Sequence, residues 1–510
     1  MLEGGGQRQD ADVIVIGSGI GGLSAGALLA RYGKRVILYE SHTIPGGAAH
    51  SFSRKGFHFD SGPSFYCGLS DERSLNPLRQ ILDALEETVP AIAYDPLGHY
   101  HFPEGTFPVY RDARHYREAV AQITPQGATE LHRLERRLLS LYEALRGIPA
   151  LALRADFNAF PILLSRYLPS LFKLLPHLGS VQAAVADLMQ DVKDSWLRRL
   201  IDLECFLLSG LKADGTATPE VAFMFGERSC SVVDYPIGGS GAIVEALVRG
   251  LKRWGGRVHL GAHVEQILVE SGRVVGVRLR NGAISRAPVV ISNATRWDTC
   301  TKLLRREDLP TAYRAEVLKT PAIASFMHLH LGIRAEGLEN LTGHHVVIHN
   351  SNQDITTPGN TCMISIPSVW DANLAPPGHH VIHAYTLEPY EGWQRDSSYK
   401  ERKRQRAAPL FRALERIIPD LHQRIVLELI GTPLTHSHYL RRYQGTYGPA
   451  IAAGQSTFPG PQTPLPGLYL VGDSTMPGIG VPAVAASGIV CANTLVKPEQ
   501  TLTLLKKVNR

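Results

Sequence analysis

The stretch Asp12-Val13-Ile14-Val15-Ile16-Gly17-Ser18-Gly19-Ile20-Gly21-Gly22-Leu23 decides the fold of this chain. An apolar run of strand length leads into Gly-x-Gly-x-x-Gly, and a helical pattern rich in Ala and Leu follows. Gly17 permits the tight turn, Gly19 lets the backbone approach a pyrophosphate, and Gly22 lets helix and strand pack closely. The helix N-terminus offers unpaired N–H groups and its dipole to the phosphates. The stretch predicts the start of a Rossmann-like nucleotide-binding domain.

The adenosine end of the nucleotide is predicted from the next strand. Arg35–Tyr39 reads as a strand that ends on Glu40, 23 residues after Gly17. An acid at about this distance accepts hydrogen bonds from the ribose hydroxyls. The loop beyond it contains Gly46 and Gly47, where the absence of a Cβ lets the backbone run close to a ligand. We further expect the backbone of Val264, at the start of a later strand, to contact the adenine.

The C-terminal part of the chain supplies a second nucleotide element. An apolar strand ends in Gly472-Asp473, and a glycine-rich helix start with Gly478, Gly480 and Val481 follows. We expect Asp473 to hold the ribityl hydroxyls of a flavin, and the helix amides to face the isoalloxazine edge where the charge of reduced flavin collects. Two such elements, about 450 residues apart, suit the two ends of a long cofactor and favour FAD over NAD.

Length and composition restrict the classes of protein. A chain of 510 residues exceeds one hydrophobic core, so at least two domains are expected. The net charge of +6 comes without a dense basic motif interleaved with aromatics, so no nucleic acid partner is expected. The six cysteines are scattered, which argues against a disulfide framework or structural zinc and for a reducing compartment. Residues 1–10 show neither a signal-peptide apolar region nor a transit-like sequence.

The segment 157–178 is apolar and basic. It carries leucines and aromatics, Arg166 and Lys173, three prolines and no acid. Such a composition predicts a monotopic patch that lies in a membrane interface with its cations toward the headgroups. The alternative is a helical lid that packs on the core.

These patterns predict an α/β protein with two discontinuous domains. The first is a Rossmann-like FAD-binding domain of the GR2 flavoprotein type, formed by 10–75, 228–300 and 463–500. The second is an inserted α+β substrate-binding domain, formed by 76–227 and 301–462, in which a mixed sheet accompanies a helical, membrane-facing region around 150–180.

Two histidine pairs are candidate metal ligands. His328/His330 and His436/His438 are each expected on one face of a strand, a spacing that zinc or iron can use. Neither pair has a carboxylate at a matching offset, so no metal site is expected.

Several stretches carry a resemblance that covers roughly residues 12–495. The chain resembles the carotenoid isomerase (prolycopene isomerase) branch of the flavoproteins that also include bacterial-type phytoene desaturases and retinol saturases. The most specific stretches are Ile44–Gly47, Ile201–Phe206, Tyr235–Gly239, Ile291–Thr299, Leu374–His380 and Gly445–Pro449.

The resemblance implies an enzyme, a flavin-dependent carotenoid cis–trans isomerase of carotenoid biosynthesis. Its substrates would be poly-cis carotenes such as prolycopene, and it would use reduced FAD without net redox change. NAD(P)H or a quinone would be the indirect electron donor or acceptor. The implied location is peripheral, on a plastid (thylakoid or envelope) or cyanobacterial membrane, with other carotenoid-pathway enzymes as partners.

The chain departs from the branch beside the expected flavin edge, at Thr475-Met476 and over Ser64–Cys67. These departures leave open a paralogue of the same fold, a carotenoid desaturase, saturase or hydratase. A catalytically inert carrier of apolar ligands is a third possibility, which the intact glycines and the acids Glu40 and Asp473 disfavour.

Acids in apolar surroundings are the candidate catalytic side chains. Asp202 and Glu204 lie in an otherwise apolar helical pattern, where the ionised form of a carboxyl is disfavoured and the group can exchange protons with a polyene. The alternative is that one of them pairs with Arg198 or Arg199.

Overall fold

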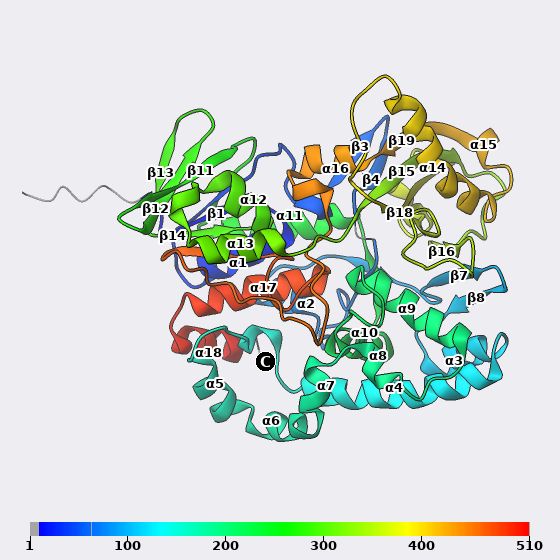
Figure 1. Cartoon of the computed structure of the whole chain (residues 1–510), viewed down its shortest axis with the longest axis horizontal. Coiled ribbons are helices and arrows are strands. Elements are labelled where there is room, and N and C mark those ends of the chain that lie inside the picture. The colour runs from blue at the N-terminus through cyan, green and yellow to red at the C-terminus, as the bar shows by residue number, and fades with distance from the viewer. Residues whose placement is uncertain (1–9, 63, 509–510) are drawn as a thin grey trace, which may run out of the picture.

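The computed structural model describes residues 10–62 and 64–508, so most of the leader lies outside the described residues. The elements form three groups (Figure 1): an α/β part at the upper left, a second sheet at the upper right, and a layer of helices below. Chain segments distant in sequence combine in the α/β part, where the blue helix α1 (Ile20–Arg31) lies beside the red helix α17 (Val481–Thr494).

A five-stranded parallel sheet forms the centre of the α/β part. Its strand order is β10-β2-β1-β14-β20, and every neighbouring pair is parallel. Val13 and Val15 of β1 pack with helix α1, whereas Ile14 and Ile16 pack on the opposite face with an antiparallel three-stranded sheet. Because both faces are buried, these strands read as continuous apolar runs. The bounds are β1 Val13–Ile16, α1 Ile20–Arg31, β2 Val36–Tyr39, α11 Ser240–Arg253, β10 Arg257–His259, β11 Val264–Glu270, β12 Arg273–Leu279, β13 Ile284–Arg286, β14 Val289–Ser292, β20 Leu468–Leu470 and α17 Val481–Thr494.

The second sheet has seven strands in the order β19-β15-β18-β17-β16-β7-β8. It is mixed, because β16 and β7 are parallel while the other neighbours are antiparallel. One face packs against helix α14, and the other contributes to the core that it shares with the helical layer. The bounds are β7 Gly98–Phe102, β8 Gly105–Val109, β15 Ser325–Arg334, β16 His344–Ile348, β17 Thr361–Ser365, β18 His379–Glu388, α14 Tyr399–Glu415 and β19 Ile425–Gly431.

One strand prediction was wrong. His436 and His438 lie in helix α16 (Pro433–Leu440), so their spacing does not place them on one strand face. Pro433 at the first helical position, after Thr432, favours this helix because its fixed φ suits the start and its missing N–H needs no partner there. His328 and His330 do lie on a strand, β15.

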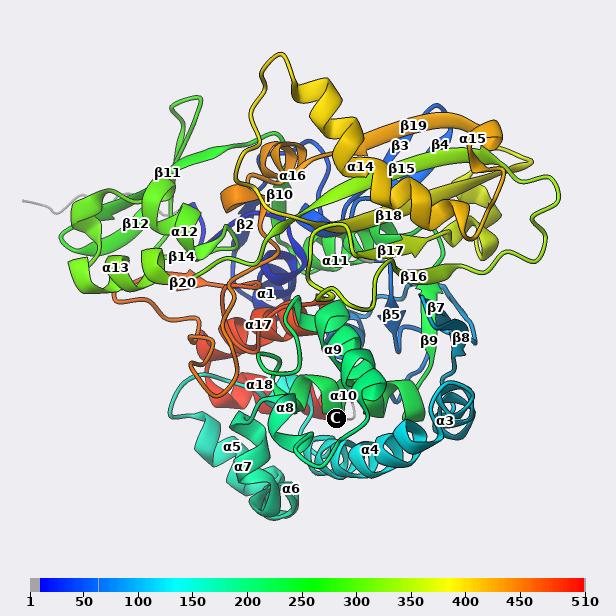
Figure 2. The ribbon, with the colours of Figure 1, turned by 45° about the vertical axis from the view of Figure 1, so that its right-hand side comes forward.

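The helical layer and the small connecting elements complete the fold. Helix α9 begins where Asp194 accepts a hydrogen bond from the Leu197 N–H at 2.7 Å, and it ends at Gly210, whose φ is +75°. Helices α5, α6 and α7 project below the rest of the molecule (Figure 2). The bounds are β3 Ser51–Arg54, β4 Phe57–Asp60, β5 Tyr66–Cys67, α2 Pro77–Leu85, β6 Ala91–Ala93, α3 Ala113–Ala121, α4 Pro125–Leu145, α5 Ala159–Arg166, α6 Leu168–Leu174, α7 Leu178–Gln182, α8 Val185–Leu188, α9 Ser195–Ser209, α10 Thr218–Cys230, β9 Val233–Pro236, α12 Arg296–Asp298, α13 Thr311–Lys319, α15 Leu421–Arg424 and α18 Pro498–Lys507.

Candidate active site

The glycine-rich turn lies at the carboxyl ends of the parallel strands. A Cβ built on Gly22 would lie 2.3 Å from the carbonyl oxygen of Gly17, and one on Gly21 would lie 2.8 Å from Cα of Gly472. No side chain fits at either position, so the first turn of α1 packs directly on the backbone of the C-terminal element. The free N–H groups of this turn are left to face a pyrophosphate.

Glu40 is buried at the end of β2 and organises the adenosine side. Its Oε2 accepts hydrogen bonds from the N–H and the hydroxyl of Ser18, at 2.8 and 2.7 Å, and its Oε1 accepts one from the His42 N–H at 2.7 Å. The Gly46 N–H donates to the Ser18 carbonyl at 3.1 Å, which holds the Gly46-Gly47 loop beside the turn. The Ala262 N–H donates to the Glu40 carbonyl at 2.8 Å, which brings the start of β11, Val264, to the same end.

Asp473 follows the last residue of β20 by three positions and is ion-paired with Arg442. Arg442 Nε also donates to the Thr446 carbonyl at 2.6 Å, so the guanidinium is fixed between two chain segments. The sequence pattern did not identify Arg442, which follows helix α16 and belongs to no motif. In the sequence, the one indication of its role is that this basic residue precedes the Gly472-Asp473 motif by about 30 residues.

Asn293 is a second residue that the sequence analysis missed. It follows β14, and its side chain touches the glycine turn: a Cβ on Gly19 would lie 2.5 Å from its Nδ2, and one on Gly472 would lie 2.7 Å from its Oδ1. The amide thus lies between the two nucleotide elements. A polar residue at the end of a buried parallel strand was the available signal, because such strand ends meet at one edge of the sheet.

The residues present fit an FAD molecule. Glu40 and the glycine turn would hold the adenosine and the pyrophosphate, and Asp473 and the start of α17 would hold the flavin part. Gly480, with φ of +96°, has 3.7 Å between its would-be Cβ and the nearest atom, the Leu208 carbonyl oxygen, so backbone is exposed where α17 begins. The structure brings Gly19 and Gly472 together at Asn293 and pairs Gly19 with Gly46. The cofactor roles of Gly17, Gly19, Gly22, Gly46, Gly47, Val264, Gly472, Gly478 and Val481 stay predictions.

A cavity of about 520 Å³ begins at the N-terminus of α17. Pro477, Ile479 and Val481 line it there. The cavity lies between the helical layer and the seven-stranded sheet, whose strand β18 contributes Tyr385. The volume lies within the ~300–1,000 Å³ typical of ligand sites, and the wall is mostly apolar, as such sites usually are. The cavity therefore suits an apolar molecule that meets the flavin edge.

The two acids predicted to be catalytic lie in different surroundings on α9. Glu204 is buried in the cavity wall, accepts a hydrogen bond from the Tyr116 hydroxyl at 2.9 Å and is ion-paired with Arg228 at 3.4 Å. Asp202 accepts a hydrogen bond from the Ala213 N–H at 3.0 Å and is not among the described residues that line the cavity. Glu204 thus pairs with Arg228 and not with the sequence neighbours considered above.

A third acid, Glu220, lines the cavity and was not predicted. It lies in the first turn of α10, and burial raises its pKa to about 7. Its place after Thr218-Pro219 is typical of an ordinary helix start, which is why the sequence alone gave no reason to select it.

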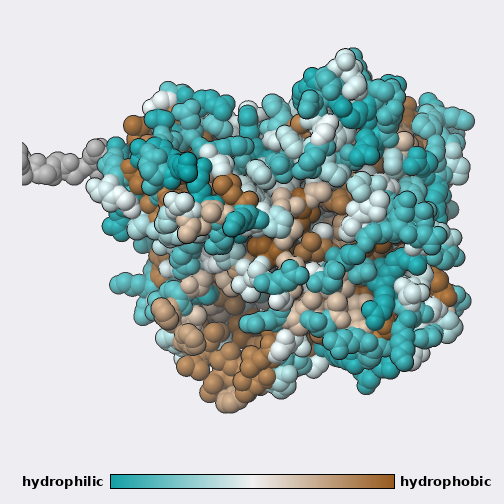
Figure 3. Space-filling view, in the orientation of Figure 1, coloured by the Kyte–Doolittle hydropathy of each residue, from teal (hydrophilic) through white to brown (hydrophobic). Residues whose placement is uncertain are grey.

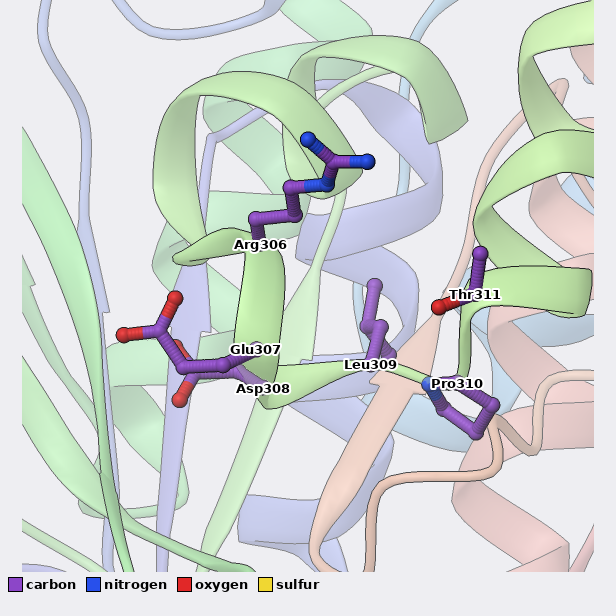
Figure 4. Close-up of a pocket in the computed structure, with 6 residues that line it drawn as sticks. All are labelled: Arg306, Glu307, Asp308, Leu309, Pro310 and Thr311. Atoms are coloured by element: carbon purple, nitrogen blue, oxygen red, sulfur yellow. The ribbon is translucent and has the colours of Figure 1, made fainter.

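A further depression lies elsewhere on the surface. It is lined by six consecutive residues, 306–311, of which Arg306, Glu307 and Asp308 are charged (Figure 4). These residues connect the helical turn Thr299–Leu303 to α13 and are not among those that line the cavity described above.

Comparison with known proteins identifies the family. The family model "Flavin containing amine oxidoreductase" matches residues 20–496. The chain belongs to this flavoprotein family. Prolycopene isomerase 2, chloroplastic, from an Oncidium hybrid cultivar is 35% identical over 96% of this chain and 84% of its own length. A neurosporene-forming phytoene desaturase from Cereibacter sphaeroides is 27% identical over 95% of this chain and 94% of its own length. The predicted resemblance to the carotenoid isomerase branch is confirmed.

The fold of this flavoprotein also matches a solved structure. An oxidoreductase from Methanosarcina mazei superposes with a TM-score of 0.59 and 23% identity, and the match covers 93% of this chain and 98% of that one. The predicted α/β fold class and the flavin cofactor are confirmed.

Proposed function

We propose that this flavoprotein is an FAD-dependent carotenoid cis–trans isomerase that acts on poly-cis carotenes such as prolycopene. The observation that carries the proposal is the cavity: it is mostly apolar and is lined by residues at the start of α17, where the flavin edge is expected. Its relatives named as prolycopene isomerases support the substrate class. A carotenoid desaturase, saturase or hydratase of the same fold is the alternative, because a phytoene desaturase is among the relatives.

The protein's own part in the reaction is to bind, orient and exclude water. We propose that Gly17, Glu40 and Asp473 hold FAD as described above, and that the apolar wall holds the polyene against its edge. Reduced FAD, when bound, supplies electron density beside the polyene. We further propose that NAD(P)H or a quinone delivers the electrons indirectly, and that Glu204, fixed by Arg228, serves as a paired charge in the wall while Asp202 holds the loop before α10.

The test of the function is incubation of the FAD-loaded protein with poly-cis-lycopene in liposomes without oxygen. We expect an all-trans product only when the flavin has been reduced beforehand. The mass of this product should be unchanged, because isomerisation moves no net electrons. Chromatography with mass detection reads the outcome, and the oxidised protein is the control. A product that differs by two hydrogens would instead establish desaturation or saturation, and one that gains water would establish hydration.

We also propose that the protein binds a membrane surface through helices α5–α7. The apolar surface at the lower left of Figure 3 covers this region, where Phe157 is 91% and Phe172 62% exposed. Arg166 and Lys173 lie among the apolar residues, and 157–182 contain no acid. A face of this kind matches an anionic lipid interface. Among the described residues, no helix combines the length and apolarity needed to cross a bilayer.

The patch adjoins one end of the cavity, which supports a lipid partner. Leu153, between α4 and α5, lines the cavity and is itself exposed. A Cβ on Gly147 would lie 2.2 Å from Ser170 Oγ, so α6 packs directly on the segment that supplies Arg146 and Ile148 to the cavity wall. A lipid-dissolved substrate could thus enter from the bound face. The chloroplastic relatives support a plastid location, and a cyanobacterial membrane is the alternative.

Removing two exposed rings tests the membrane proposal. We expect Phe157→Ser combined with Phe172→Ser to weaken binding to anionic liposomes at least about 10-fold, because each ring buried in the interface contributes on the order of 1 kcal/mol or more. Co-sedimentation measures the bound fraction. Leu260→Ser, at another exposed apolar residue, is the matched control. Equal binding by the double variant and the control would contradict the proposal.

A further inference from the structure

The carboxyl of Glu220 lies at the flavin end of the cavity. A Cβ built on Gly478 would lie 3.2 Å from Glu220 Oε1 and 3.2 Å from Cε2 of Phe458. Gly478 precedes α17 by three residues, and its neighbours Pro477 and Ile479 line the same end of the cavity. The carboxyl therefore borders both the loop at the expected flavin edge and the space that an apolar substrate would occupy.

No other described residue engages this carboxyl. Within residues 10–62 and 64–508, no hydrogen bond or ion pair is made by the Glu220 side chain. Glu204, which also lines the cavity, is by contrast bound to both Tyr116 and Arg228. Burial alone raises the pKa of Glu220 to about 7, so the neutral and ionised forms are both accessible near neutral pH.

Several ionisable groups on the helices around α10 are engaged elsewhere. On α4, the Tyr142 hydroxyl donates to Glu227 at 2.8 Å, and Arg146 pairs with Glu143 at 2.8 Å. On α8, Asp187 accepts a hydrogen bond from the Ala184 N–H at 3.0 Å.

On α9, burial raises the pKa of Cys205 well above its ordinary value, so this thiol stays neutral beside Glu220. The Glu204–Arg228 pair is neutral overall, and Arg228 is eight residues along α10, about 12 Å from Glu220 by helix rise. Of the two carboxyls that line the cavity, Glu220 is thus the one without a hydrogen-bond or ion-pair partner among the described residues.

We propose that Glu220 is the acid–base residue of the isomerisation, giving a proton to a polyene carbon beside the Gly478 loop and taking one back after bond rotation. This assignment rests on the isomerase function proposed above. In the first step the carboxyl O–H bond breaks and a C–H bond forms, which leaves a carboxylate and a delocalised polyene cation. The former double bond is then a single bond and rotates. In the second step a C–H bond breaks, its electrons restore the double bond, and the proton returns to the carboxylate.

The overall change conserves atoms and electrons, so the product has the substrate's mass in ordinary water. In D₂O the carboxyl carries deuterium, and the carbon that received it can lose either hydrogen. Wild-type enzyme with reduced flavin is therefore expected to give isomerised product that contains deuterium. Deuterium-free product would overturn the assignment, because rotation would then occur without proton transfer.

Variants at the same position provide the second readout. We expect Glu220→Gln to lower the isomerisation rate about 100-fold or more, as loss of a general acid does, and Glu220→Asp to retain part of the rate. The wild-type rate should fall as pH rises through about 7, because the acid form is lost, and this dependence should be absent in Glu220→Gln. Glu118→Gln, at an exposed glutamate of α3, is the matched control. A wild-type rate in Glu220→Gln would refute the role.

A spectroscopic measurement separates this inference from the proposed function. Ionisation of a carboxyl beside the flavin shifts the absorption of bound FAD, so a titration should show an inflection near pH 7 that Glu220→Gln abolishes and Glu118→Gln retains. If the substrate changes mass by two hydrogens, the isomerase function fails while a Glu220-dependent inflection still places the carboxyl at the flavin. An inflection that is missing, or that survives in Glu220→Gln, overturns the placement whichever reaction is found.

Discussion

Replacing Arg228 with methionine is expected to lower the free energy of unfolding by about 3–5 kcal/mol, because it leaves Glu204 buried without its cation. Glu204 and Arg228 are 4% and 6% exposed, and the guanidinium also lies over the rings of Tyr116 and Phe225, at 4.4 and 4.3 Å. Methionine keeps much of the apolar stem but none of the charge. Urea denaturation, with the midpoint and slope compared to wild type, measures the change.

Two further variants test the reason for that loss. Glu204→Met combined with Arg228→Met should recover much of the stability, because the desolvated charge is removed together with its partner. Arg114→Met, at an arginine that is largely exposed and 4.0 Å from Glu118, should change stability by no more than about 0.5 kcal/mol. If Arg228→Met behaved like Arg114→Met, the buried pair would contribute nothing to stability.

Replacing Glu40 with alanine is expected to raise the dissociation constant for FAD about 100-fold or more. The carboxylate would lose its charge-assisted hydrogen bonds to the ribose, each worth about 1.5–3 kcal/mol, and its bonds to Ser18 that position the glycine turn. Quenching of flavin fluorescence on titration of apoprotein measures the constant.

The control for this variant is another glutamate of the same domain. Glu265→Ala removes a half-exposed side chain on β11, one residue beyond Val264 and paired with Arg278 at 3.5 Å. It should leave FAD affinity within a few-fold of wild type, since exposed pairs contribute about 0–1 kcal/mol. An unchanged constant in Glu40→Ala would mean that the ribose lies elsewhere.

The residues predicted for the FAD site come from elements that are local in sequence. Gly17, Glu40 and Asp473 each follow an apolar strand at a spacing that the nucleotide geometry dictates, and all three lie at the ends of strands in one sheet. The prediction of a strand at His436 was wrong because alternation over a few residues does not distinguish a strand from a short helix that begins at a proline.

The sequence by itself determined the fold class and the flavin cofactor, because glycine turns and strand-end acids act through neighbouring residues, and its resemblance to known proteins indicated the carotenoid-enzyme family. Only the tertiary structure decided which acids share the cavity. Arg442 reaches Asp473 across 31 residues, Arg228 reaches Glu204 across 24, and Glu220 meets Gly478 across 258. Such contacts follow from how sheets and helices pack, and no local spacing encodes which buried carboxyl receives a partner and which faces the cavity without one.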